Sequence, residues 1–327
     1  MKEYTLSNDA GMTLRVADIG ATITELHVPD RNGDTADVAL GFDSLEQYRN
    51  NTPSFGCVVG RYGGRIANGR FDIDGVTYEL ATRADGHHLH GGESGFAVMM
   101  YSVRQQDGRL VLTAESPDGD EGYPGALTLS VTYTLTESNE LIINYEATTT
   151  RPTVLNPTNH CYFNLRGHGN GDVLDHVLSV AADRVLACHP DNIPTGKIDD
   201  VAGGPLDFRE PQRLGSRIPD ALYQLDHSFI TADDMLEERA EVARLVEPQS
   251  GRVMIVATTE PCVQVFTPDV MRFEGPAKQQ ADYAPYGAIC LEAQHFPNSP
   301  NEPGFPSTLL RPGETFRSST SYRFETA

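Results

Sequence analysis

The chain has 327 residues, of which 25 are Lys or Arg and 46 are Asp or Glu, so its formal net charge is −21 at pH 7. That negative field repels the phosphate backbone of nucleic acid and the surface of anionic membranes, which excludes both as expected partners. No stretch approaches the ~20 consecutive apolar residues of a membrane-spanning helix, and the first residues lack the apolar run of a signal peptide. We therefore expect a cytoplasmic protein that binds a small neutral molecule.

The five cysteines are odd in number, widely spaced and never arranged as Cys-x-x-Cys. Most lie in apolar, strand-like segments, which is typical of reduced and buried thiols rather than of disulfides or metal ligands. The cysteines are Cys57, Cys161, Cys188, Cys262 and Cys290.

Short strands joined by tight turns are expected along most of the chain. Asp74-Gly75 and Asp107-Gly108 each separate two strand-like runs, which is the pattern of a two-residue β-hairpin. Residues 126–136 alternate apolar and polar side chains, turn at Ser138-Asn139 and return through 141–145. Further strands are expected at 253–258, 263–267 and 319–324.

Helices are expected to be few. Residues 44–48 suggest one helical turn, and the charged stretch 234–246 fits either a helix or a strand. Thirty Gly and 21 Pro punctuate many short strands, which is typical of a large antiparallel sandwich or barrel. No linker and no repeat of fixed period divides the chain, so residues 1–327 are predicted to form a single all-β domain.

Residues 56–70 are rich in glycine and arginine, which superficially suggests a phosphate-binding loop. That interpretation requires a helix after the loop, whereas the Asp74-Gly75 hairpin follows, so we reject it. An arginine held in a glycine turn is suited to donating hydrogen bonds to sugar hydroxyls. A surface ion pair is the alternative role for Arg61 and Arg70.

The segment from His87 to Gly92 reads His-His-Leu-His-Gly-Gly. Its two glycines allow a sharp turn or a close approach of the backbone to a ligand. His88 and His90 could also bind a metal ion, but Glu93 follows them too closely for the ligand spacing of cupin-like enzymes. No metal is therefore expected.

Residues 153–165 are predicted to form a strand with one polar and one apolar face. Alternation places Thr158, His160, Tyr162 and Asn164 together on the polar face. Such a face is either exposed to solvent or the wall of a pocket that binds a polyol. The sequence leaves both alternatives open.

Two further segments place polar side chains in apolar surroundings. Asp226 can accept hydrogen bonds from two hydroxyl groups, and Gln264 can both donate and accept one. Residues 287–291 are predicted to form a buried strand with Glu292 at its end, on the same face as Cys290. A carboxylate at a strand end beside an irregular loop is a candidate general base, and the alternative is a group that caps the loop or pairs with an arginine.

In their order along the chain, these segments resemble the aldose 1-epimerase (galactose mutarotase) family. The matching segments cover nearly the whole chain and lie at 60–67, 89–92, 116–125, 156–165, 193–196, 226–229, 264–267 and 292–297. The resemblance implies a large antiparallel β-supersandwich with few short helices, an open cleft and no required cofactor. It also implies an enzyme that interconverts the α and β anomers of a free aldohexose such as galactose or glucose.

The same resemblance implies roles for individual residues. In the family, the glutamate that matches Glu292 removes the proton of the C1 hydroxyl, and the histidine that matches His160 delivers a proton to the ring oxygen. The histidine that matches His90 helps to hold the reacting region. The hydroxyl-binding residues of the family match Arg65, Asp226 and Gln264.

One position departs from the family pattern. The family typically carries Asn before the arginine, whereas this chain has Gly64 before Arg65, which leaves the sugar preference open. Two alternatives are a sugar-binding or sensing module without catalysis and a metal-dependent isomerase that uses His88 and His90. The sequence does not distinguish a monomer from a homodimer.

Overall fold

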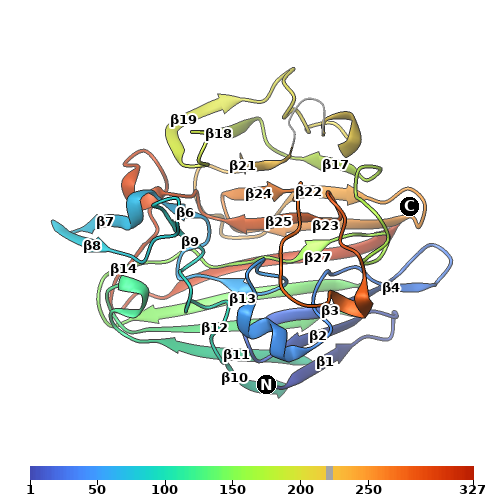
Figure 1. Ribbon diagram of the computed structural model, residues 1–327, viewed down its shortest axis with the longest axis horizontal. Coiled ribbons are helices and arrows are strands. Elements are labelled where there is room, and N and C mark those ends of the chain that lie inside the picture. The colour runs from blue at the N-terminus through green and yellow to red at the C-terminus, as the bar shows by residue number, and fades with distance from the viewer. Residues whose placement is uncertain (219–223) are drawn as a thin grey trace.

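The structure is a computed structural model that describes residues 1–218 and 224–327. These residues form strands and short 3-10 helices, with no α-helix among them, so the predicted all-β fold is confirmed (Figure 1). The largest sheet has nine antiparallel strands in the spatial order β10 (Ser102–Gln106), β11 (Arg109–Ser116), β12 (Leu127–Leu135), β13 (Glu140–Thr149), β27 (Phe316–Thr326), β23 (Arg252–Thr258), β22 (Ala240–Val246), β17 (Val177–Val180) and β20 (Gln212–Arg213).

A second sheet has six strands, which are also antiparallel. Its spatial order is β16 (Tyr162–Phe163), β25 (Ile289–Gln294), β24 (Cys262–Phe266), β21 (Asp226–Ile230), β18 (Arg184–Cys188) and β19 (Pro194–Asp200). A third sheet has four strands, in the order β1 (Glu3–Ser7), β2 (Thr13–Ala17), β3 (Thr22–Pro29) and β4 (Thr35–Asp37).

Short strand pairs and single 3-10 turns complete the structure. The pairs are β14 (Thr153–Val154) with β26 (Leu309–Leu310), β15 (Thr158–Asn159) with β5 (Val58–Val59), β6 (Arg65–Ile66) with β9 (His88–Leu89), and β7 (Arg70–Ile73) with β8 (Val76–Glu79). The 3-10 helices are η1 (Leu45–Asn50), η2 (Ala67–Gly69), η3 (Asp120–Gly122), η4 (Leu214–Ser216), η5 (Lys278–Gln280) and η6 (Ser299–Asn301). None of these helices is long and apolar enough to cross a membrane.

The predicted hairpins form because their turn residues tolerate the backbone that a tight turn requires. Asp74 and Gly75, between β7 and β8, have φ of +51° and +80°, and Asp107 and Gly108, between β10 and β11, have φ of +51° and +71°. Positive φ at both central positions is the type I′ geometry, whose twist matches that of the flanking strands. In β12, the alternation buries the apolar side chains and leaves the threonines toward solvent.

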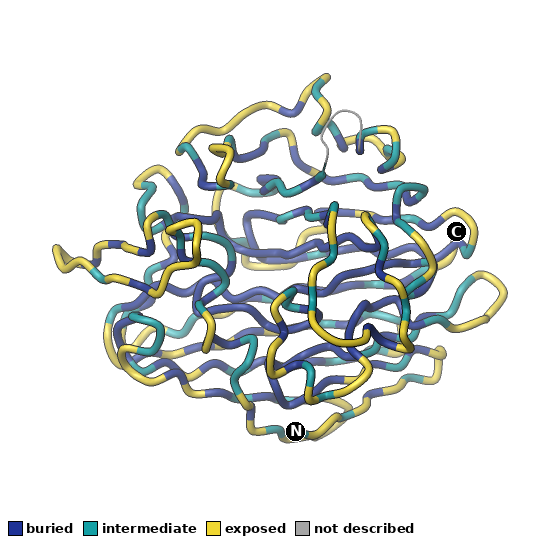
Figure 2. The backbone as a smooth tube through the Cα atoms, in the orientation of Figure 1, coloured by how far each residue is buried: buried dark blue, intermediate teal, exposed yellow. Residues whose placement is uncertain are grey.

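The nine-stranded and six-stranded sheets pack face to face. The hydroxyl of Tyr322 on β27 donates to the carbonyl of Leu291 on β25, and the rings of Tyr322 and Phe163 lie 5.1 Å apart. The main apolar core contains inward side chains of both sheets and of the four-stranded sheet. Most buried residues accordingly lie on the strands in the middle of the molecule, and most exposed residues lie on the connecting loops (Figure 2).

The sequence of 234–246 fits either a helix or a strand, and the structure has the strand: Ala240–Val246 pairs with β23 as β22. Two other expectations about elements need correction. Residues 153–165 do not form one strand but three short ones, β14, β15 and β16, each paired with a different partner strand. The strand before Glu292 does not end there: β25 continues to Gln294, because Ala293 and Gln294 still pair with β24.

Candidate active site

One face of the six-stranded sheet forms the floor of a cavity of about 210 Å³. Cross-strand pairing aligns Ser228, Gln264 and Glu292 in one row on β21, β24 and β25. The neighbouring row consists of Asp226, Phe266, Cys290 and Tyr162. The alternate residues of these strands lie in the apolar core, so the period of two in the sequence creates a polar floor above a hydrophobic layer.

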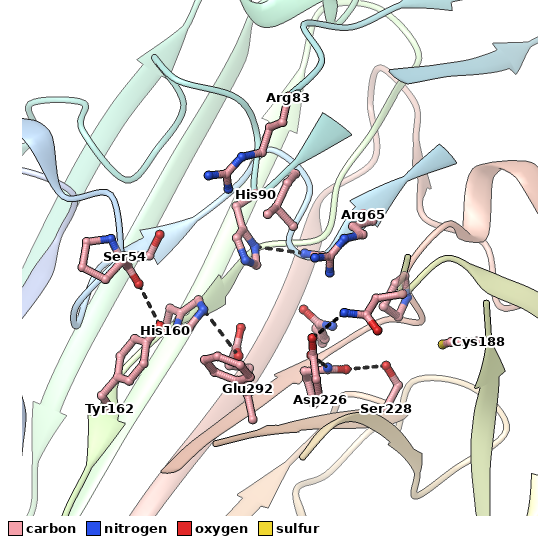
Figure 3. A pocket seen from close by; sticks show the side chains of 18 of the residues that line it. Ser54, Arg65, Arg83, His90, His160, Tyr162, Cys188, Asp226, Ser228 and Glu292 are labelled. Atoms are coloured by element: carbon pink, nitrogen blue, oxygen red, sulfur yellow. Dashed lines mark hydrogen bonds and ion pairs between the residues drawn. The ribbon is translucent and has the colours of Figure 1, made fainter. Parts of the chain in front are cut away.

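Loops from distant parts of the chain form the walls of this cavity. Arg65 enters from β6, His90 from the turn after β9, and His160 from the bend between β15 and β16. The sequence-predicted residues therefore lie around one cavity (Figure 3). They are Arg65, His90, His160, Asp226, Gln264 and Glu292. Their individual roles stay a prediction.

Glu292 and His160 form a buried pair at the centre of the cavity. The Nε2 atom of His160 lies 3.6 Å from Oε1 of Glu292, and only 5 % and 2 % of the two residues is exposed. Burial lowers the pKa of His160 to about 4. Burial, assisted by the negative charge of Asp226, raises the pKa of Glu292 well above its ordinary value. Burial thus favours the neutral form of each group.

Stacking on the Tyr162 ring holds the His160 ring in place. The ring stacks on Tyr162, with centroids 4.9 Å apart and an interplanar angle of 15°. The Tyr162 hydroxyl is itself held, because it donates to the carbonyl of Pro53. The Nδ1 atom of His160 is buried and has no hydrogen-bond partner among the described residues, whereas its Nε2 atom faces Glu292.

His90 is held as a neutral donor. Its Nδ1 atom accepts a hydrogen bond from the backbone N–H of Gly64 at 3.2 Å, which leaves the proton of the neutral ring on Nε2. Burial, and to a smaller extent the nearby His160, lowers the pKa of His90 well below its ordinary value. The two imidazole rings meet edge to face, with centroids 5.2 Å apart.

A hydrogen-bonded chain of four side chains forms the other end of the cavity. Gln264 accepts from the hydroxyl of Ser228 at 2.5 Å and donates to Asp226 at 2.6 Å. Asn192, from the loop between β18 and β19, donates to the second oxygen of Asp226 at 2.7 Å. Burial raises the pKa of Asp226, against the opposing influence of the Arg65 charge. The Nε atom of Arg65 is buried without a partner among the described residues.

The structure does not support the metal-binding alternative for His88. Its Nδ1 atom bonds the carbonyl of Ala81 at 2.6 Å, and its Nε2 atom bonds the hydroxyl of Tyr123 at 2.7 Å. Both ring nitrogens are therefore occupied by protein groups. A second group, His160, Cys290 and Glu292, has ligand atoms close enough together to surround an ion, but it does not include His88 or His90.

Arg61 has neither of the roles considered for it from the sequence. Only 2 % of the residue is exposed, and its guanidinium donates to the carbonyls of Ser116, Pro117 and Pro124. It therefore holds the loop 116–124 in place beneath the surface and is neither a sugar ligand nor a surface ion pair.

Several residues of the cavity escaped the sequence reasoning. Ser228 and Gln294 each follow a predicted site residue by two positions, so the strand alternation would have placed both on the cavity face. Asn192 and Ser54 lie in loops and offered no such pattern. Cys188 is the one cysteine that is exposed, and it lies at the edge of the cavity (Figure 3).

A family model described as aldose 1-epimerase matches residues 2–323 of the chain. The chain belongs to the aldose 1-epimerase family. The resemblance inferred from the sequence is thus confirmed. As a member of this family, the chain is an isomerase that interconverts sugar anomers.

Three relatives of the aldose 1-epimerase family each cover 98–100 % of the chain. A galactose mutarotase from Mus musculus is 40 % identical over 328 residues, which is 100 % of this chain and 95 % of that protein. An aldose 1-epimerase from Escherichia coli (strain K12) is 35 % identical, over 98 % of this chain and 94 % of that protein. The crystal structure of an aldose epimerase homologue from C. elegans superimposes with a TM-score of 0.93 at 29 % identity, covering 100 % of this chain and 99 % of that one. The predicted supersandwich is confirmed by this match.

Proposed function

We propose that the chain interconverts the α and β anomers of a free aldohexose, galactose or glucose, with Glu292 as general base and His160 as general acid. The observation that carries this proposal is the buried pair, whose Nε2 and Oε1 atoms lie 3.6 Å apart in the cavity. The choice of sugar is supported by relatives about 40 % identical to this chain that carry the name galactose mutarotase. No cofactor is needed for this chemistry.

The reaction moves two protons and breaks one bond. Glu292 removes the proton of the hydroxyl on the anomeric carbon, while His160 delivers a proton to the ring oxygen. The bond between the anomeric carbon and the ring oxygen then breaks, and its electron pair stays on that oxygen while the anomeric carbon becomes an aldehyde. Rotation about the C1–C2 bond presents the other face of the aldehyde, and ring closure returns both protons.

Substrate binding prepares the two groups for these transfers. In the empty cavity burial favours a protonated Glu292 and a neutral His160. A sugar hydroxyl that donates to Glu292 favours the carboxylate, and a ring oxygen that accepts from His160 favours the imidazolium. The bound sugar therefore draws the single proton of the pair from Glu292 toward His160, which is the arrangement that ring opening requires.

The remaining residues hold the sugar in register with this pair. Asp226 is fixed by two amide groups, so its oxygens accept hydroxyl protons in a set orientation. Arg65 has an unpartnered Nε atom and can donate to a hydroxyl. His90 presents its Nε2 proton next to His160 and can stabilise negative charge on the anomeric oxygen.

Polarimetry of freshly dissolved α-galactose and α-glucose tests the proposal. Glu292→Gln keeps the shape of the side chain and removes its basicity, so the catalysed rate should fall by at least about 100-fold. Glu115→Gln, the same change at an exposed position of β11, should leave the rate unchanged. If Glu292→Gln equilibrates the sugars as fast as the parent, the base has been misassigned. Saturable sugar binding by the parent without any acceleration would instead favour the non-catalytic sensing module.

We further propose a cytoplasmic location, since the five cysteines are free and disulfides are rare in a reducing compartment; cell fractionation tests this. Light scattering distinguishes a monomer from a homodimer, the two oligomeric states that the sequence leaves open. The sugar is the proposed partner, and nucleic acid and membranes are not, because the net charge is −21.

A further inference from the structure

Gln294 is a buried amide that the mechanism above does not use. It follows Glu292 by two residues on β25 and therefore shares the cavity face of that strand. Only 1 % of the residue is exposed. Its Oε1 atom nevertheless has no hydrogen-bond partner among the residues that the structure describes.

A nearby amide shows what a purely structural role looks like. Asn156 is equally buried, and its side chain makes three hydrogen bonds. Its Nδ2 atom donates to the carbonyls of Gly63 and His295, and its Oδ1 atom accepts from the backbone N–H of His295. The chain thus fully satisfies the Asn156 amide and leaves the Oε1 atom of Gln294, on the cavity floor, without a partner among the described residues. Because an unsatisfied buried polar group destabilises the fold, Gln294 requires another explanation.

Two glycines border the Gln294 amide. A Cβ atom on Gly63 would stand 3.1 Å from Oε1 of Gln294, and one on Gly64 would stand 3.6 Å from its Nε2. The amide therefore lies along the backbone of these glycines, just before Arg65. Gln294 lines the same cavity as Glu292 and Arg65.

We propose that the Gln294 carboxamide hydrogen-bonds one hydroxyl group of the bound sugar and so contributes to the choice of sugar. This inference rests on the proposed function of the same cavity. A carboxamide both donates and accepts hydrogen bonds, as a hydroxyl does, so either orientation of the amide fits such a partner. A site built to bond a hydroxyl also rejects a sugar that lacks it, because the amide is then left unpaired.

The test combines Gln294→Met with a series of monodeoxy galactoses. Methionine has a similar length and is apolar and unbranched, so the variant loses no hydrogen bond within the protein. We expect kcat/KM for galactose to fall by about 10- to 100-fold, as for the loss of a buried hydrogen bond to substrate. For one monodeoxy galactose, the one without the contacted hydroxyl, parent and variant should have equal kcat/KM.

Thermal unfolding of the empty protein separates binding from a structural role. Gln294→Met should unfold at the same or a higher temperature than the parent, because an unsatisfied amide has been replaced by an apolar group. Asn156→Leu, which removes a fully bonded amide, should unfold at a lower temperature. Gln106→Met, the same change at an exposed position of β10, should alter neither stability nor kcat/KM.

Two outcomes would overturn the inference. One is an unchanged kcat/KM of Gln294→Met for galactose, and the other is an equal reduction for galactose and for every deoxy sugar. Failure of the proposed function has a different signature, since the parent itself would then accelerate mutarotation of neither galactose nor glucose.

Discussion

The buried Glu292–His160 pair determines how activity should depend on pH. With both groups protonated the pair is a cation and has no base, and with both deprotonated it is an anion and has no acid. Only the form with one proton can catalyse the reaction. Burial disfavours both charged forms, so it extends the pH range of the neutral, active form in both directions.

We therefore predict a broad bell-shaped profile of kcat/KM against pH. The acid limb follows the pKa of His160, which burial lowers to about 4. The alkaline limb follows the pKa of Glu292, which lies well above its ordinary value. The two limbs belong to the pair as a unit, because the groups interact at 3.6 Å. Initial rates by polarimetry, with circular dichroism at each pH to verify folding, measure the profile.

Asp226→Asn tests the assignment of the alkaline limb to Glu292, because it should move that limb in one direction only. The negative charge of Asp226 raises the pKa of Glu292, so its removal should move the alkaline limb to lower pH and leave the acid limb in place. The rate will also fall, because a hydroxyl ligand is lost, but the shape of the profile is the readout. An acid limb that moves while the alkaline limb stays fixed would contradict the assignment.

For single residues, the sequence predicted which side chains lie at the cavity but not their protonation states or tautomers. Strand alternation placed Glu292 on one face with Cys290, because the period of two is a property of each strand alone. Asp226 and Gln264 were singled out as polar side chains in apolar segments and by the resemblance to the family. The tautomer of His90 is set by a hydrogen bond from Gly64, 26 residues away, and its neutral form results from burial. Such a contact exists only in the folded chain, and no local pattern indicates it.

Among the elements, the turn after β9 is the most constrained part of the cavity wall. Gly91 has a φ of +87°, and a Cβ atom on it would lie 1.8 Å from the carbonyl oxygen of Gly60. This close approach places His90 beside Gly64 and above His160. Gly86, in the loop before β9, has a similar φ of +82° but nothing within 4 Å of a Cβ atom.

These two glycines make a matched pair of variants. Gly86→Ala should lower the free energy of unfolding by only about 1 kcal/mol, the cost of a left-handed backbone for alanine. Gly91→Ala meets backbone atoms as well, and should lower it by more than about 3 kcal/mol or prevent folding. Denaturant unfolding and soluble yield measure both. Equal stability of the two variants would show that the Gly60 contact relaxes without cost.

Elements with strong local signals were predicted well. The Asp74-Gly75 and Asp107-Gly108 hairpins and the strands around Ser138-Asn139 form where the sequence places them, because turn chemistry and alternation act within a few residues. The segment 153–165 failed because its residues pair with three different strands. The sequence of this segment does alternate polar and apolar residues, but the three partner strands, which break it into short strands, come from elsewhere in the chain.

For the whole molecule, the distribution of the core bears on how many domains the chain forms. The main apolar core takes side chains from the nine-stranded, six-stranded and four-stranded sheets. The cavity is lined by residues from distant parts of the chain. Arg65 and His90 belong to its walls, and Asp226 and Glu292 belong to its floor. A sheet that separated from the rest would lose both its core and its site.

We therefore predict that residues 1–327 unfold as one domain in a single cooperative transition. Differential scanning calorimetry should give equal calorimetric and van't Hoff enthalpies. Saturating galactose should raise the temperature of that entire transition, because a ligand that binds only the folded state stabilises everything that unfolds with its site. Glu115→Gln should respond to the sugar as the parent does. If the six-stranded sheet were an independent domain, two transitions would appear and galactose would move only one of them.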